Sequence, residues 1–216
     1  MDLLIATGNA GKAREFRDML GDAGIVWRSL NDFSGDAAVP ETGQTFAENA
    51  QLKAAGYAQR YHLWTLADDS GLEVDPLNKK PGVFSARWAE QHNAGSGDAA
   101  NNRLLLQQLA NVSDDQRTGR FVCALALCDP SGKLVLSCQD SVEGRILRSP
   151  RGSNGFGYDP LFVPNGFDRT TAELDAAEKH RISHRGKALR QMKRLMSDAG
   201  LFAGSIVTKD SRVAQR

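Results

Sequence analysis

Short apolar blocks, separated by polar and glycine-containing turns, recur along the 216-residue chain. Blocks of roughly four to eight such residues predict buried strands. The block at 121–128 is apolar on both faces, as a central strand should be, and the turn-forming sequence DPSG after it predicts a hairpin. Strands are therefore expected over residues 3–6, 26–30, 63–67, 121–128, 133–138 and 142–147.

Helical spacing is found between several of these strands. Ala13, Phe16 and Leu20 share one face of a helix, and Gly21 follows where a C-cap glycine belongs. The TFAE sequence at 45–48 has the spacing of a capping box. Helices are expected from the turn at 7–9 to about residue 20, and over 45–61, 101–109, 172–179 and 183–199.

Two long segments show neither period. Residues 82–102 are rich in Gly, Ala and Asn and are expected to form a mobile loop, and residues 150–164 form a glycine-rich loop with embedded aromatic residues. Strand, helix and hairpin units in this order predict an α/β fold with a mixed sheet, not a strict βαβ repeat. The length fits one domain over residues 1–216, in one or two lobes, and the polar tail from about residue 204 is expected to be flexible.

Composition excludes several classes of function. The net charge is +1, so nothing global indicates binding to nucleic acid or to an anionic membrane. The start, MDLLIATGN, lacks the regions of a signal peptide, and no apolar run approaches the roughly 20 residues that span a bilayer. Cys123, Cys128 and Cys138 lack metal-binding spacing and are expected to be free thiols in a reducing compartment. We expect a cytoplasmic protein whose affinity for phosphate comes only from a local site.

The stretch LADDSGLEV places Asp68, Asp69 and Ser70 directly after an apolar run, where we expect the chain to leave a strand for a turn. Asp, Ser and Gly are ordinary turn formers, and the stretch alone favours that interpretation. Strand alternation would point Asp68 and Asp69 to opposite sides, so that one of them reaches a cleft and the other supports the turn or a second layer of contacts.

The stretch TGNAGK lies between the first strand and the first helix. Free backbone N–H groups at the positive end of a helix dipole form an anion site, to which Asn9 and Lys12 can add an amide and a charge. The spacing is not that of a P-loop, because two residues separate Gly8 from Gly11 and Lys12 is followed by Ala13. A plain helix start capped by Asn9 explains the same residues equally well.

Two further stretches favour function over ordinary structure only slightly. In SHRGK, Ser183 is a good N-cap, which places His184 and Arg185 in a first helical turn, where cations oppose the dipole. Such broken local rules tend to mark functional sites, although both side chains could simply point into solvent. In GSNGFGYDPLF, Phe156 or Tyr158 could stack on a flat base, or the loop could pack its aromatic rings inward.

Six motifs occur in one order between residue 3 and about residue 199: TGNAGK, ETG with TFAENAQLKA, LADDSGLEVD, PGVFSAR, GFGYDPLF and AEKHRISHRGKAL. Together they closely resemble the inosine triphosphate pyrophosphatase family, the house-cleaning dITP/XTP pyrophosphatases. The resemblance implies Mg²⁺-dependent hydrolysis of non-canonical purine nucleoside triphosphates (ITP, dITP, XTP) to the monophosphate and pyrophosphate. It also implies an elongated α/β fold with two lobes around a central cleft, and a homodimer.

The resemblance further implies roles for individual residues. Asp69 would be the proton acceptor and, with Glu41, would bind the metal, since Mg²⁺ needs only one or two carboxylates beside water and phosphate oxygens. Ser70 would contact the substrate. The phosphates would be held by Lys53 and by Thr7, Gly8, Asn9, Ala10, Gly11 and Lys12. The base pocket would be formed by Phe156, Gly157, Tyr158, Asp159, Lys179, His184 and Arg185.

Two other functions compete with this one. A related pyrophosphatase acting on modified pyrimidine nucleotides is disfavoured by purine-sized stacking at Phe156 and by the HR pair at 184–185. A nucleotide-binding regulator that has lost hydrolysis is disfavoured because Asp69, Glu41 and Lys12 are all present.

Overall fold

The structure, a computed structural model, describes residues 2–21, 25–33 and 38–201. Its centre is a mixed sheet with the strand order β2-β1-β3-β5-β6-β7, and β4 pairs with β3 beside this path. β1 pairs in parallel with β2 and β3, and the remaining pairs are antiparallel. The strands are β1 (Asp2–Ile5), β2 (Val26–Ser29), β3 (Trp64–Val74), β4 (Lys80–Pro81), β5 (Thr118–Cys128), β6 (Leu134–Ile146) and β7 (Phe162–Pro164). The predicted α/β class with a mixed sheet is confirmed.

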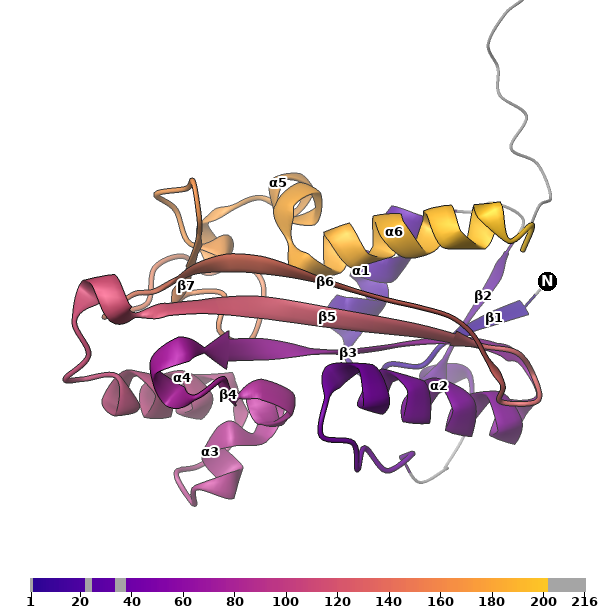
Figure 1. Cartoon of the computed structure of the whole chain (residues 1–216), viewed down its shortest axis with the longest axis horizontal. Coiled ribbons are helices and arrows are strands. Elements are labelled where there is room, and N and C mark those ends of the chain that lie inside the picture. Colours follow the sequence, from indigo (N-terminus) through magenta and orange to yellow (C-terminus); the bar gives the residue numbers. More distant parts are fainter. Residues whose placement is uncertain (1, 22–24, 34–37, 202–216) are drawn as a thin grey trace, which may run out of the picture.

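Helices cover both faces of the sheet (Figure 1). They are α1 (Ala10–Leu20), α2 (Phe46–Tyr61), α3 (Trp88–Gln91), α4 (Gly97–Gln108), α5 (Ala176–Ile182) and α6 (His184–Asp198). Alternation along β3 separates the two apolar layers, because Leu66 packs in the cluster with α1 and α6 whereas Ala67 packs in the cluster with α2. A third cluster joins α4 to the far end of β3 through Leu72 and Leu105.

Strand β3 does not end at the two aspartates. It continues to Val74, and β5 pairs with it from Thr65 to Val74 without a register shift. The expected turn at Asp68 and Asp69 is therefore wrong. The ladder with β5 outweighs the local turn propensity, because both carboxylates find polar partners on neighbouring helices.

Residues 82–102 are not a mobile loop. They form a 3-10 turn (Gly82–Arg87), α3 and the first turns of α4, which begins at Gly97 and not at residue 101. Trp88 anchors the segment with 4% of its surface exposed and donates from Nε1 to Gln108. Asn101 accepts from the Ala89 N–H and donates to the Ala86 carbonyl, so the Asn-rich composition supplies internal hydrogen bonds.

Other boundaries differ from expectation as well. β5 begins at Thr118 and not at residue 121, and β7 occupies the end of the segment at 150–164 that is predicted to be a loop. The predicted strands at 133–138 and 142–147 are one strand, β6, which pairs with β5 along nearly all of its length. Helix α5 starts at Ala176 and not at residue 172, because Asp175 is its N-cap and accepts from the Glu178 N–H. The predicted flexible tail from residue 204 lies outside the described residues.

The short β1 creates an open edge beside β3. β1 stops at Ile5, which pairs with Leu66, whereas β3 runs on for the length of the DDSGLEV motif. The start of α1 and the 3-10 turn at 82–87 lie at this point of the sheet.

No helix among the described residues has the length and apolar character needed to cross a membrane. Cys123, Cys128 and Cys138 are free, as predicted.

Candidate active site

A cavity of about 290 Å³ lies at the open edge of β3. Most of the predicted site residues line this one cavity although they come from six separate stretches of sequence. They are Thr7, Gly8, Asn9, Lys12, Glu41, Lys53, Asp69, Ser70, Phe156, Gly157, Tyr158, Asp159, Lys179, His184 and Arg185. Ala10 and Gly11 begin α1, and nothing further is described of them. The roles of all these residues remain predictions.

The TGNAGK stretch turns from β1 into α1. Asn9 Oδ1 accepts from the Lys12 N–H at 3.1 Å and so caps the helix, while the Asn9 N–H donates to Thr7 Oγ1. Thr7, Asn9 and Lys12 also line the cavity. The helix start and the candidate anion site are thus the same structure, and the two interpretations do not exclude each other.

Asp68 and Asp69 point to opposite sides of β3, as alternation predicted. Asp69 lines the cavity and accepts from Asn49 Nδ2 of α2 at 3.1 Å. Asp68 lies on the α1 side, 2.8 Å from Lys12 Nζ, and accepts from Ser70 Oγ at 3.1 Å. Only Asp69 is therefore placed to meet a substrate directly.

The two aspartates also differ in proton affinity. Burial raises the pKa of Asp69, and the positive charge of Lys53 only partly opposes this shift. Burial alone would raise the pKa of Asp68 as well, but the charges of Lys12, Arg185 and Lys53 outweigh it and hold that pKa well below its usual range. Asp68 is thus a fixed anion, whereas Asp69 has the raised proton affinity expected of a general base.

Glu41 and Lys53 lie beside Asp69. Lys53 Nζ is 2.9 Å from Glu41 Oε1 and donates to the Asp68 carbonyl at 3.0 Å. Burial lowers the pKa of Lys53, but the charges of Asp68 and Glu41 outweigh this and leave it raised, so the ammonium is retained. This places a permanent cation next to the carboxylates of Glu41 and Asp69.

The carboxylates fit a metal that the substrate helps to bind. Among the described residues there is no cluster of three or more His, Cys, Asp or Glu side chains that could enclose a metal ion. Glu41 and Asp69 nevertheless both face the cavity. Mg²⁺ is typically held by one or two carboxylates together with water and phosphate oxygens, so this oxygen donor set fits Mg²⁺.

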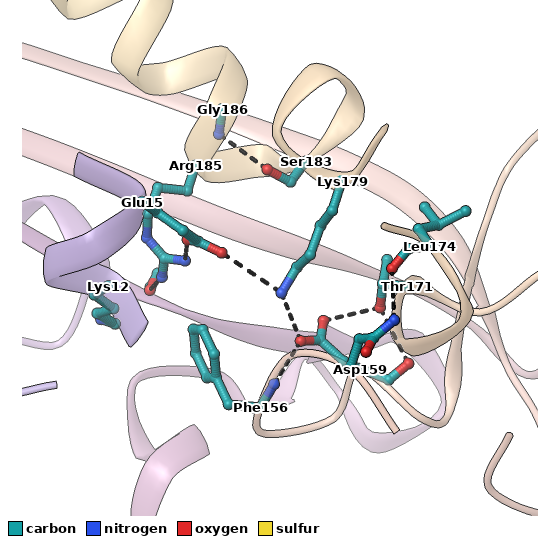
Figure 2. A network of polar contacts seen from close by, with 12 residues as sticks. Lys12, Glu15, Phe156, Asp159, Thr171, Leu174, Lys179, Ser183, Arg185 and Gly186 are labelled. Carbon is teal, nitrogen blue, oxygen red and sulfur yellow. Dashed lines mark hydrogen bonds and ion pairs between the residues drawn. The ribbon is translucent and has the colours of Figure 1, made fainter. Parts of the chain in front are cut away.

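A buried ion network occupies the other end of the cavity (Figure 2). Arg185, 2% exposed, donates to Glu15 and, at 2.8 Å, to Ser70 Oγ. Lys179 lies between Glu15 and Asp159, and its Nζ is 2.6 Å from Asp159 Oδ2. His184 is also buried, with 7% of its surface exposed. The alternative that the HR pair points into solvent is therefore wrong.

Sequence reasoning missed Glu15. This residue lies on α1 three positions after Lys12, one helical turn further along the same face. It joins Lys179 to Arg185 and so links α1 to α5 and α6. The spacing from Lys12 was the only local signal, and it is shared by many exposed helical glutamates.

Two aromatic rings at this end of the cavity pack on polar side chains, Phe156 on two cations and Phe121 on the imidazole of His184. Lys179 Nζ is 4.8 Å and Arg185 Cζ is 5.5 Å from the centre of the Phe156 ring. His184 stacks on Phe121, with ring centres 4.9 Å apart and planes inclined by 14°. Burial, followed by the charges of Arg185, Lys179 and Lys12, holds the pKa of His184 well below its usual range, so the imidazole is neutral.

The chain is similar to known proteins over most of its length. The chain matches the Ham1 family over residues 3–195. A dITP/XTP pyrophosphatase of Exiguobacterium sibiricum is 49% identical over 192 residues, which cover 89% of this chain and 95% of that protein. One from Streptomyces coelicolor is 48% identical over 196 residues, covering 88% and 94%.

Solved structures of Ham1 proteins are similar to this chain in fold. A HAM1 protein from Coxiella burnetii superposes with a TM-score of 0.82 at 40% identity, covering 92% of this chain and 99% of its own. The Ham1 protein of Staphylococcus aureus gives a TM-score of 0.81 at 35% identity, covering 92% and 100%. The resemblance seen in the six motifs is confirmed, and the chain belongs to the Ham1 family.

Proposed function

We propose that this protein hydrolyses the non-canonical purine nucleoside triphosphates ITP, dITP and XTP to the monophosphate and pyrophosphate, and so cleanses the nucleotide pool. Relatives named dITP/XTP pyrophosphatase, 45–49% identical, support this activity. One structural observation carries the proposal. A single cavity combines a helix start and lysines suited to phosphates, a carboxylate of raised pKa, and an aromatic, arginine-containing end suited to a base.

The reaction would occur at the phosphate end. Asp69 would accept the proton of the attacking water, because its carboxylate faces the cavity and its pKa is raised. Lys12 and Lys53 would stabilise the charge that develops as pyrophosphate leaves. Glu41 and Asp69 would hold Mg²⁺, which supplies Lewis-acid stabilisation of phosphate oxygens. Asp68 keeps Lys12 in place from behind the strand.

Base selection would depend on Arg185. Its two terminal nitrogens already bond Glu15, Ser70 and Asp68. Its Nε–H is buried and, among the described residues, has no hydrogen-bond partner. Arg185 lines the cavity and is a donor-only group, so a 6-oxo oxygen could accept from its guanidinium, whereas the 6-amino group of adenine would face it donor to donor. The arrangement therefore favours hypoxanthine and xanthine over adenine.

We also propose a cytoplasmic homodimer. The free cysteines support a reducing compartment, and the family resemblance supports the dimer. Light scattering coupled to size-exclusion chromatography measures the mass directly, and a monomer at micromolar concentration would refute the dimer.

A substrate panel tests the activity. Purified protein is incubated with Mg²⁺ and ITP, dITP, XTP, ATP or a modified pyrimidine triphosphate, and pyrophosphate and orthophosphate are quantified separately. We expect pyrophosphate from the 6-oxo purines and a much lower kcat/KM for ATP. Preference for the pyrimidine would support the rival pyrophosphatase. Binding of ITP without turnover would support the regulator, and Asp69→Asn serves as the inactive control.

A further inference from the structure

Helix α4 holds the loop that carries Phe156. The Gly157 N–H donates to Asp98 Oδ2 at 2.6 Å, and the Gly157 carbonyl accepts from Asn102 Nδ2 at 3.0 Å. Asp98 and Asn102 are four positions apart, so they lie on one face of α4. Both polar backbone groups of one loop residue are thus bound by a helix more than 50 residues earlier in the chain.

The loop needs such support because of its glycines. Gly155 and Gly157 flank Phe156 with φ values of +80° and +64°, in the left-handed region that glycine adopts most readily. Glycine also loses more conformational freedom on ordering than other residues. The Phe156 N–H donates to Asp159 Oδ2, which is a contact within the loop. The contacts of α4 with Gly157 tie the loop to another part of the fold.

We propose that Asp98 and Asn102 are positioning residues that set the Phe156 ring at the base end of the cavity and so contribute to nucleotide affinity. This inference rests on the proposed function, in which Phe156 stacks on the purine. The Asp98 bond is charge-assisted and short, and Asp98 itself lines the cavity. The residues proposed for the phosphates belong to other elements, namely the turn before α1, the start of α1, and α2.

Removal of the carboxylate should weaken base-dependent binding selectively. For Asp98→Ala we expect the Kd for ITP to rise about 10-fold, the value for losing a charge-assisted hydrogen bond at a partly exposed site. Asp98→Asn keeps an acceptor oxygen, so its Kd for ITP should rise only about 2-fold. Inorganic tripolyphosphate, which has no base, should bind both variants as it binds wild type. Asp115→Ala, which removes an exposed aspartate outside the cavity, is the matched control.

The decisive test is a double-mutant cycle with Phe156→Ala. Kd values for ITP and for tripolyphosphate are measured by calorimetry with Ca²⁺ in place of Mg²⁺, so that the result does not depend on turnover. If Asp98 acts through Phe156, Asp98→Ala should cause almost no further rise in the Kd for ITP when Phe156 has already been replaced by Ala. Amide hydrogen exchange of the loop at 152–162 should also be faster in Asp98→Ala without ligand.

Several results would overturn the inference. These are additive losses in the cycle, an equal loss of tripolyphosphate affinity, or unchanged exchange in the loop. Wild type that binds ITP but releases no pyrophosphate would refute the proposed function and leave the positioning role of Asp98 and Asn102 intact.

Discussion

The buried imidazole of His184 should make the protein lose stability in mild acid. His184 is 7% exposed, stacks on Phe121 and is near the cations Arg185, Lys179 and Lys12, with Asp68 as the opposing charge. Its pKa in the native state lies well below the ordinary 6.5. Below pH 6.5 the unfolded chain therefore binds a proton that the native state excludes, and the free energy of unfolding falls as the pH falls.

The size of the effect follows from one proton. With an unfolded pKa of 6.5, exclusion of one proton lowers the free energy of unfolding relative to pH 8 by at most about 0.8 kcal/mol at pH 6 and at most about 2 kcal/mol at pH 5. His184→Gln removes the titrating group. The lost stacking on Phe121 lowers the stability of the variant by an amount that does not vary with pH. The difference in the free energy of unfolding between wild type and variant should therefore shrink between pH 8 and pH 5, by at most about 2 kcal/mol.

Urea unfolding at intervals between pH 8 and pH 5 measures this difference. Asp69, whose pKa is raised, is present in both proteins, so its titration cancels. Tyr158→Phe is the control, because it removes a buried hydrogen bond to the Ser85 carbonyl and burial raises the tyrosine pKa far from this range. A His184→Gln difference that is as flat with pH as that of the control would refute the reasoning.

Four other predictions follow from the same cavity. Asp69→Asn should lower kcat by ~10²–10⁴-fold yet keep or raise stability at pH 7, because burial disfavours the native carboxylate; near-wild-type turnover contradicts the role. Asp68→Asn should instead lower the free energy of unfolding in urea by about 3–5 kcal/mol, because it leaves Lys12 and Arg185 with less charge compensation. An equal change in Asp69→Asn would contradict this role of Asp68. Arg185→Ala should bring the ITP:ATP ratio of kcat/KM close to one, and a retained ratio excludes Arg185 as the residue that selects the base. A chelator should abolish hydrolysis by wild type, and full activity in chelator excludes a metal requirement.

Local sequence signals were sufficient to predict a helix start whose capping contacts lie within the helix itself. The capping box predicted at α2 is present, since Thr45 Oγ1 accepts from the Glu48 N–H at 3.2 Å. Ser183 likewise caps α6 by accepting from the Gly186 N–H. The length of β3 was not predictable in this way, because its acidic residues have turn propensity and their partners Lys12 and Asn49 are distant in sequence.

The candidate site shows the same division. Motif order was enough to predict side chains that the fold brings to one cavity, because each motif contains its own chemistry. Glu15 has no such local mark, and its partner Arg185 is 170 positions later. Asp98 belongs to a segment whose small polar residues indicate a loop, and only the packing of Trp88 and Asn101 makes it a helix that faces Gly157.

Four cations that line the cavity have a carboxylate of the protein as their neighbour: Lys12 with Asp68, Lys53 with Glu41, Lys179 with Asp159, and Arg185 with Glu15. Arg87, which also lines the cavity, lies over the Phe84 ring instead. A nucleotide that contacts these four cations would compete with counterions that belong to the protein itself. Binding becomes an exchange of ion partners, for which increasing ionic strength has a smaller effect than for an unshielded basic patch. Abundant small anions such as orthophosphate cannot replace several internal partners at once. The site is thereby protected against the general anion content of its surroundings, and occupancy requires a ligand long enough to engage several cations together.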